Sequence, residues 1–169
     1  MQKRQQNITK ALLAVYFVLL VWIILFKMQT NVSLFFHMGY RHMNLIPLKG
    51  SVIIDGKIRI SEIILNVLIF VPFGIYISML KEEWSFLQKT APFFCTSLAF
   101  EILQYIFGIG ATDITDLIGN TLGGMIGILL FELLSKLLKK NTIKILNVVA
   151  SIGTVLITGL LFLLIAANL

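Results

Sequence analysis

The chain has 169 residues, of which 58% are hydrophobic and only 13% are charged. Its mean hydropathy of +0.94 excludes a soluble domain, because the interior of a domain this small cannot hide so much apolar surface. The formal net charge of +6 does not indicate nucleic acid, since the basic residues flank apolar stretches and fit lipid headgroups better. The single cysteine, Cys95, excludes an internal disulfide and a metal site built from cysteines.

The apolar stretches predict an all-α polytopic membrane protein in one domain covering residues 1–169. About five transmembrane helices are expected, near residues 11–26, 60–80, 90–107, 116–138 and 145–169. The first stretch is slightly short, but Lys10 and Lys27 can reach both interfaces, and no small-residue cleavage site follows it. We therefore expect an uncleaved first span. Pro72 and Gly74 predict a kink in the second span.

Residues 27–59 form a long connection for two helices, which predicts a small folded element between spans one and two. Pro47 disfavours helix at the residue before it. Residues 52–60 place Asp55-Gly56 between two short apolar runs, a pattern that resembles a small hairpin.

The distribution of basic residues predicts the orientation, because cytoplasmic segments carry an excess of Lys and Arg. With the N-terminus inside the cell, nine basic residues are on the inner side: Lys3, Arg4, Lys10, Lys81, Lys89, Lys136, Lys139, Lys140 and Lys144. Five are on the outer side: Lys27, Arg41, Lys49, Lys57 and Arg59. The sequence thus predicts a cytoplasmic N-terminus and a C-terminus outside.

Polar side chains within the spans are the candidate functional residues, because such groups cost free energy in hydrocarbon. In the predicted orientation they all lie on the outer side, below the basic loop: Asn66, Glu101, Gln104, Asp113, Asp116 and Asn120. Spacings of three and four residues put Glu101, Gln104 and Tyr105 on one face of the third span. An outward-facing pocket lined by carboxylates and amides is the simplest interpretation.

The fourth span carries a polar stripe that continues into glycines. Asp116, Asn120, Gly123 and Gly127 repeat at four, three and four residues. Small residues at this spacing let another helix backbone approach closely, either within the chain or in a homo-oligomer.

Each candidate residue also has a purely structural interpretation. Asp113 could cap the fourth helix, with Asp116 in its first turn. Asn66, Gln104 and Asn120 could be interhelical hydrogen-bonding groups rather than ligand contacts. Glu101 is the hardest to explain structurally, because a buried carboxylate needs a cation, a proton or strong donors.

Three sequence blocks in the same order resemble the VanZ-like family. They are Asn44-Leu45-Ile46-Pro47-Leu48, then Asn66-Val67-Leu68-Ile69-Phe70-Val71-Pro72-Phe73-Gly74, then Glu101-x-x-Gln104 with Asp113-Ile114-x-Asp116-Leu117-x-x-Asn120-Thr121-x-Gly123. The resemblance covers about residues 41–127. Some family members carry an arginine shortly before the position of Asp113, where this chain has Gly-Ile-Gly-Ala. Any role of that arginine is therefore either absent here or supplied by Arg41 or Arg59.

The resemblance implies a bacterial membrane protein of the cell envelope. The founding member of the family gives low-level resistance to the lipoglycopeptide antibiotic teicoplanin, so resistance is the implied role. The resemblance supplies no established reaction and no catalytic residues. The sequence itself contains no serine elbow, phosphate-binding loop or cysteine–histidine nucleophile.

Two functional hypotheses follow. In the first, the protein is a non-enzymatic envelope factor whose outer pocket binds a lipid-linked wall precursor or a polar headgroup and limits the access of a lipoglycopeptide. The expected ligand-binding residues are Asn44, Asn66, Gln104, Asp113, Asn120, Arg41 and Arg59. No cofactor and no protein-bound metal are expected, since His37 and His42 lack a third well-spaced ligand.

In the second hypothesis, the protein is a membrane-embedded enzyme acting on a lipid-linked or phosphorylated envelope substrate. Glu101 would be the general acid or base, and Asp116, with Asp113, would position the substrate or a divalent cation such as Mg²⁺. Arg41 and Arg59 would hold an anionic group. A third, structural possibility is a homo-oligomer assembled through the face that carries Gly123 and Gly127.

Overall fold

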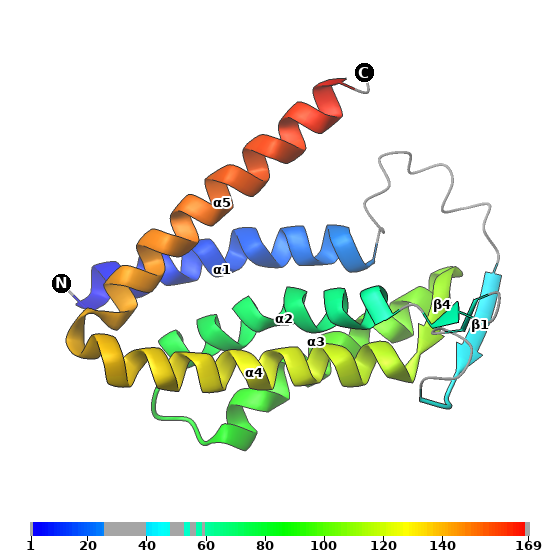
Figure 1. The fold of residues 1–169 in the computed structure, drawn as a ribbon, viewed down its shortest axis with the longest axis horizontal. Helices are drawn as coiled ribbons and strands as arrows, with labels where there is room; N and C mark the ends of the chain where they lie inside the picture. The colour runs from blue at the N-terminus through cyan, green and yellow to red at the C-terminus, as the bar shows by residue number, and fades with distance from the viewer. Residues whose placement is uncertain (1, 26–39, 48–52, 55–56, 59, 168–169) are drawn as a thin grey trace.

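The computed structural model describes residues 2–25, 40–47, 53–54, 57–58 and 60–167. Within this part of the chain five long helices run up and down, and two small strand pairs lie at one end of the bundle (Figure 1). The helices are α1 (Gln2–Ile24), α2 (Ile60–Leu80), α3 (Phe86–Phe107), α4 (Ile114–Leu138) and α5 (Thr142–Ala167). The predicted all-α polytopic class is confirmed.

Four stretches of the described chain are long and apolar enough to cross a membrane. Three of them correspond to α1, α2 and α3, whereas the fourth covers 50 residues, Ile114–Leu163. A straight helix of that length would measure about 75 Å, far more than the roughly 30 Å of a hydrocarbon core. The short 3₁₀ helix η2 (Lys139–Asn141) divides this stretch into α4 and α5. Lys139 has a φ of 52°, and the chain reverses direction there (Figure 1).

The helix bounds agree with the predicted spans except at three N-terminal ends. Helix α1 begins nine residues before the predicted span, because its polar first turns are helical as well. Helix α3 begins at Phe86 rather than residue 90, since Ser85 and Gln88 form a reciprocal capping box. Helix α5 begins at Thr142 rather than residue 145. Hydropathy marks the apolar part of a helix and not its polar, capped ends.

Helices α2 and α4 approach closely because glycines face each other. A Cβ atom added to Gly123 would lie 2.0 Å from the carbonyl oxygen of Val67, and one on Gly127 would lie 2.1 Å from that of Val71. A Cβ on Gly74 of α2 would lie 2.0 Å from the carbonyl oxygen of Gly124. The glycine stripe of α4 is thus occupied by α2 of the same chain. That face is therefore covered within the chain, which does not support the predicted homo-oligomer through Gly123 and Gly127.

An aromatic core joins α1, α2 and α3. Phe70 and Phe93 are fully buried, and Phe73 lies with its ring centroid 6.1 to 6.2 Å from both of them. Tyr16 of α1 donates a hydrogen bond to the carbonyl oxygen of Ile69 at 2.5 Å. This bond lies one turn before Pro72, through which α2 continues without interruption.

The two strand pairs lie at the end of the bundle where α2 and α4 begin. Strand β1 (Tyr40–Asn44) pairs in parallel with β4 (Ile109–Asp113), and Asn44 is in register with Asp113. Strand β2 (Ile53–Ile54) pairs antiparallel with β3 (Lys57–Ile58), which confirms the predicted hairpin. The pairing of β1 with β4 was not expected from the sequence.

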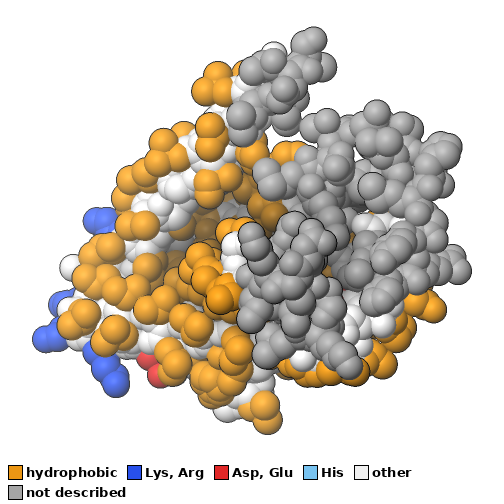
Figure 2. All heavy atoms as spheres, turned by 45° about the vertical axis from the view of Figure 1, so that its right-hand side comes forward, with side chains coloured by type: hydrophobic (Ala, Val, Ile, Leu, Met, Phe, Trp, Pro, Cys, Tyr) orange, Lys and Arg blue, Asp and Glu red, His pale blue; other side chains and the backbone are white. Residues whose placement is uncertain are grey.

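The surface of the described chain is largely apolar. Among the described residues visible in Figure 2, hydrophobic side chains predominate, and basic side chains gather at one end. That end holds the N-terminus of α1, the α2–α3 connection and the α4–α5 turn (Figure 1). The opposite end carries β1 and β4. The bundle therefore has a basic end and a strand-bearing end.

Candidate functional site

A line of polar residues along α3 points into the bundle. Ser97, Glu101 and Gln104 follow one another at spacings of four and three, and all three are buried. Each contacts a different element, namely α4, β4 and the end of α1. Tyr105, predicted on the same face, is 40% exposed and does not belong to this line.

Glu101 holds the strand that leads into α4. Its carboxylate Oε2 accepts a hydrogen bond from the backbone N–H of Asp113 at 2.8 Å, and its backbone carbonyl accepts one from the hydroxyl of Thr112 at 3.0 Å. The side chain is only 4% exposed. A buried carboxylate is stabilised by such a strong donor, so Glu101 positions the end of β4.

Asp113 joins the helix start to the first loop. Its Oδ1 accepts from the backbone N–H of Thr115 at 2.7 Å, which confirms the predicted N-cap of α4. Its Oδ2 accepts from the side-chain amide of Asn44 at 3.2 Å. Asn44 in turn accepts from the backbone N–H of Ile46 at 3.3 Å, which turns the chain just before Pro47. Asn44, Asp113 and Glu101 therefore form one connected network.

A second polar contact joins α2 to α4. The side-chain amide of Asn66 donates to Asp116 Oδ1 at 2.7 Å, within the range of charge-assisted hydrogen bonds. Asn66 lies in the second turn of α2 and Asp116 in the first turn of α4, and both side chains are partly buried. One helical turn further along α4, Asn120 donates to the hydroxyl of Ser97 at 2.9 Å.

Two buried amides of this region have an oxygen without a hydrogen-bond partner in the part of the chain that the structure describes. Gln104 donates from Nε2 to the carbonyl of Ile24, while its Oε1 has no hydrogen-bond partner among the described residues. Asn120 Oδ1 is likewise without one in the described chain, and its residue is 1% exposed. Exchanging the amide O and N of Asn120 would leave the nitrogen without a partner instead. Buried polar groups of this kind normally have a protein or water partner.

The predicted cationic residues are only partly described. Arg41 lies in β1 opposite Gly110, so its backbone is next to β4. Arg59, Lys49 and His37 lie outside the described residues. Among the residues that the structure describes, no three His, Cys, Asp or Glu side chains are grouped so that they could hold a metal ion.

Two cavities lined by described residues lie away from this network. One, of about 510 Å³, runs along α1 and α2 and includes Lys10. The other, of about 250 Å³, lies between α1, α2 and α5 and is lined mainly by apolar side chains. Neither is bordered by the predicted site residues. The outward-facing pocket therefore stays a prediction.

The predicted site residues thus meet through two sets of contacts at the strand-bearing end. Sequence reasoning missed Ser97, although its spacing of four from Glu101 was a usable signal. It also missed a polar cluster at the basic end, where Asn147 of α5 bonds to Gln5 and Thr9 of α1. Those three residues are far apart in the sequence and separately look like ordinary helix positions.

A family model and a known relative both match most of this chain. The sequence model described as VanZ/LLP1 matches residues 13–135, which include every described element from most of α1 to most of α4. Protein VanZ from Enterococcus faecium is 42% identical to this chain over 154 residues, which are 91% of each protein. No solved structure matches the chain.

Proposed function

The chain belongs to the VanZ/LLP1 family, and from this premise we propose that it is a cell-envelope factor that contributes to resistance against lipoglycopeptide antibiotics of the teicoplanin type. In this proposal the strand-bearing end faces outward and recognises the polar headgroup of a lipid-linked wall precursor. When the protein is bound to that headgroup, the antibiotic has less access to the membrane surface. The similarity to Protein VanZ over nearly the whole chain carries the proposal.

The hydrogen-bonded network supports a recognition role. The carboxylates and amides of Asn44, Asn66, Asp113 and Asp116 gather where α2 and α4 begin. Gln104 Oε1 and Asn120 Oδ1, which have no hydrogen-bond partner among the described residues, are acceptors that an N–H or O–H group of a ligand could satisfy. Arg41, through its place on β1, and Arg59 are the proposed contacts for an anionic part of the same ligand.

The test is expression of the full chain in a teicoplanin-sensitive bacterium. We expect cells that make the protein to bind less labelled teicoplanin and to grow at higher concentrations than cells with the empty vector. Asn120→Ala should lose this protection while the protein still accumulates in the membrane. Asn147→Ala is the matched control, because it removes an equally buried amide at the basic end. Unchanged binding and susceptibility in cells making the native chain would contradict the proposal.

Glu101 separates this proposal from the enzymatic alternative. In Glu101→Gln the amide oxygen can still accept the N–H of Asp113, so the network is kept, but the group can no longer take up or give a proton. A recognition role predicts nearly unchanged resistance in this variant. Loss of resistance with normal accumulation of Glu101→Gln would instead favour an enzyme with Glu101 as its acid or base.

A further inference from the structure

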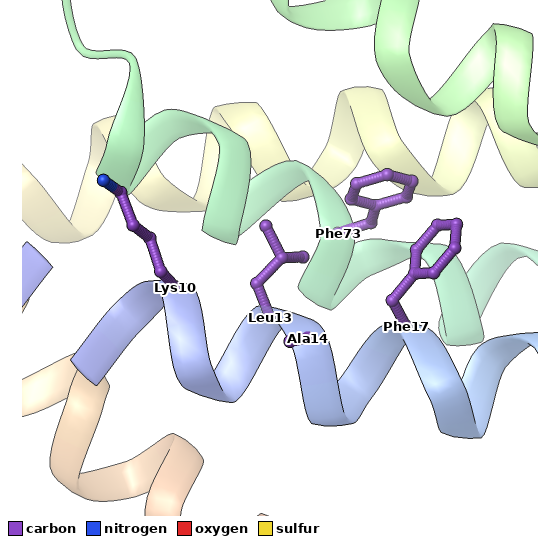
Figure 3. A pocket seen from close by; sticks show the side chains of 5 residues that line it. All are labelled: Lys10, Leu13, Ala14, Phe17 and Phe73. Carbon is purple, nitrogen blue, oxygen red and sulfur yellow. The ribbon is translucent and has the colours of Figure 1, made fainter. Parts of the chain in front are cut away.

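The 510 Å³ cavity along α1 is open on its outer side and has one charged residue. It is lined by Lys10, Leu13, Ala14, Phe17 and Phe73. Figure 3 shows the apolar side chains of Leu13 and Phe17 facing Phe73 of α2, with the ammonium group of Lys10 at one end. Lys10, Leu13 or Ala14, and Phe17 recur at spacings of three and four, so they follow one stripe of α1.

The far end of this groove is closed by aromatic rings. The rings of Phe17 and Phe73 are 6.1 Å apart and inclined at 71°, and Phe17 lies 6.5 Å from Phe100. From Lys10 to Phe17 the groove extends seven residues along α1, or about 10 Å. Ala14 also lines the groove, and its side chain is smaller than those of Leu13 and Phe17. The groove is therefore a short, open apolar depression with a cation at one end.

We propose that this groove binds one anionic glycerophospholipid of the leaflet on the basic side of the bundle. The phosphate would lie against the Lys10 ammonium, and the start of an acyl chain would lie over Ala14 between Leu13 and Phe17. Lys10 is exposed, as are Ala14 and Phe17, so a lipid can reach all three from the bilayer. The groove is near the end opposite β1 and β4, and this inference does not depend on the proposed recognition of an envelope precursor.

Charge, rather than apolar area, decides which molecule is bound. A lipid tail gains little by moving from other lipid tails to an apolar groove, so the groove alone does not select a lipid. Attraction between Lys10 and an anionic headgroup does select, at about 1 kcal/mol for each basic residue close to the surface. The groove then fixes the position of the bound lipid by packing against its chain.

Native mass spectrometry of the full chain tests the site directly. The protein is exchanged from equimolar phosphatidylglycerol and phosphatidylcholine vesicles with identical acyl chains into mild detergent, and retained lipid is counted. We expect retention of one phosphatidylglycerol in preference to phosphatidylcholine. Lys10→Gln should lower this preference about fivefold, the factor corresponding to about 1 kcal/mol. Ala14→Phe should lower the retention of both lipids by filling the groove.

Two control variants show whether a built site is responsible. Lys136→Gln removes an exposed charge from α4 at the same end, and Ala11→Phe adds bulk to an exposed α1 position that does not line the groove. Both should retain lipid like the native chain. Equal losses in Lys10→Gln and Lys136→Gln would overturn the proposal in favour of diffuse charge attraction. It would also be overturned by a dimer that disappears in Ala14→Phe, because the groove would then hold a second copy.

Discussion

Glu101 is buried and holds the start of α4 in place. Its carboxylate receives the N–H of Asp113, the residue that both ends β4 and caps α4. Removing the carboxylate would leave that N–H without its bond in a buried region, at a cost of about 1–3 kcal/mol. A residue can hold a helix start and still act on a ligand, so its contacts explain its burial without assigning a reaction. Glu101→Gln is informative because it separates the two roles.

The bond between Asn66 and Asp116 gives a prediction at the scale of single residues. Asn66→Ala should destabilise the fold, because Asp116 loses a donor 2.7 Å away. In a double-mutant cycle with Asp116→Ala, we expect a coupling free energy of about 1 kcal/mol, since intramembrane side-chain pairs average about 0.6 and reach about 1.7 kcal/mol. The measurement is denaturant unfolding in mild detergent. The control cycle pairs Asn66→Ala with Leu122→Ala, an exposed position of α4, and should be additive.

Among the elements, the α2–α4 pair has the closest backbone approach at the glycines. In a membrane the hydrophobic effect does little to drive helices together, because the lipid tails are also apolar. Close packing and polar contacts therefore supply most of the free energy of association. Gly123 and Gly127 allow that packing, and the Asn66–Asp116 bond lies in the same interface, at the end where both helices begin. Helix α3 adds the Ser97–Asn120 bond from the other side. These three helices form the tightly packed unit on which the site is built.

A glycine substitution tests this packing. Gly123→Ala places a Cβ 2.0 Å from the Val67 carbonyl oxygen, so the two backbones must separate, at a cost of about 1–3 kcal/mol. Gly153→Ala on α5 is the matched control, since no described atom lies within 4 Å of the added carbon. Alanine favours helix over glycine, so this variant should be unchanged or slightly more stable. Thermal unfolding in detergent compares them, and equal midpoints would contradict the observed packing.

The whole molecule is polarised from one end to the other. Most of the basic residues lie at the end that holds the α2–α3 connection and the α4–α5 turn, whereas the network of Asn44, Glu101 and Asp113 lies at the end with β1 and β4 (Figures 1 and 2). Helix α5 contacts α1 at the basic end through Asn147 and then diverges from it (Figure 1). The five crossings predicted from the sequence would place the two ends of the chain on opposite sides of a membrane. By the positive-inside rule we expect the basic end in the cytoplasm.

Cysteine labelling in intact cells tests this orientation. In a Cys95→Ser background, Leu45→Cys lies just after β1 and Glu83→Cys lies between α2 and α3, and both native side chains are exposed. A maleimide that does not cross membranes should label Leu45→Cys in intact cells, and Glu83→Cys only after the cells are permeabilised. The opposite pattern would show that the strand-bearing end faces the cytoplasm and would remove the basis of the proposed recognition.

The sequence by itself determined the membrane class, the approximate spans and the Asp113 cap. These features depend on the local composition of one segment or on the residues of one helical turn, so hydropathy and spacing are sufficient to find them. The glycine stripe of α4 was also visible as a pattern, but its partner was not.

Only the tertiary structure decided that α2 fills that stripe, that β1 pairs with β4, and that Asn44 reaches Asp113. Asn44 and Asp113 are 69 residues apart, and their contact depends on how α2 and α3, which lie between them in the sequence, fold back on each other. The transfer of a segment into a bilayer depends only on its own residues. The pairing of two segments depends on whether their surfaces and their hydrogen-bonding groups are complementary. For this reason the sequence identified the polar residues, and the fold determined which of them meet.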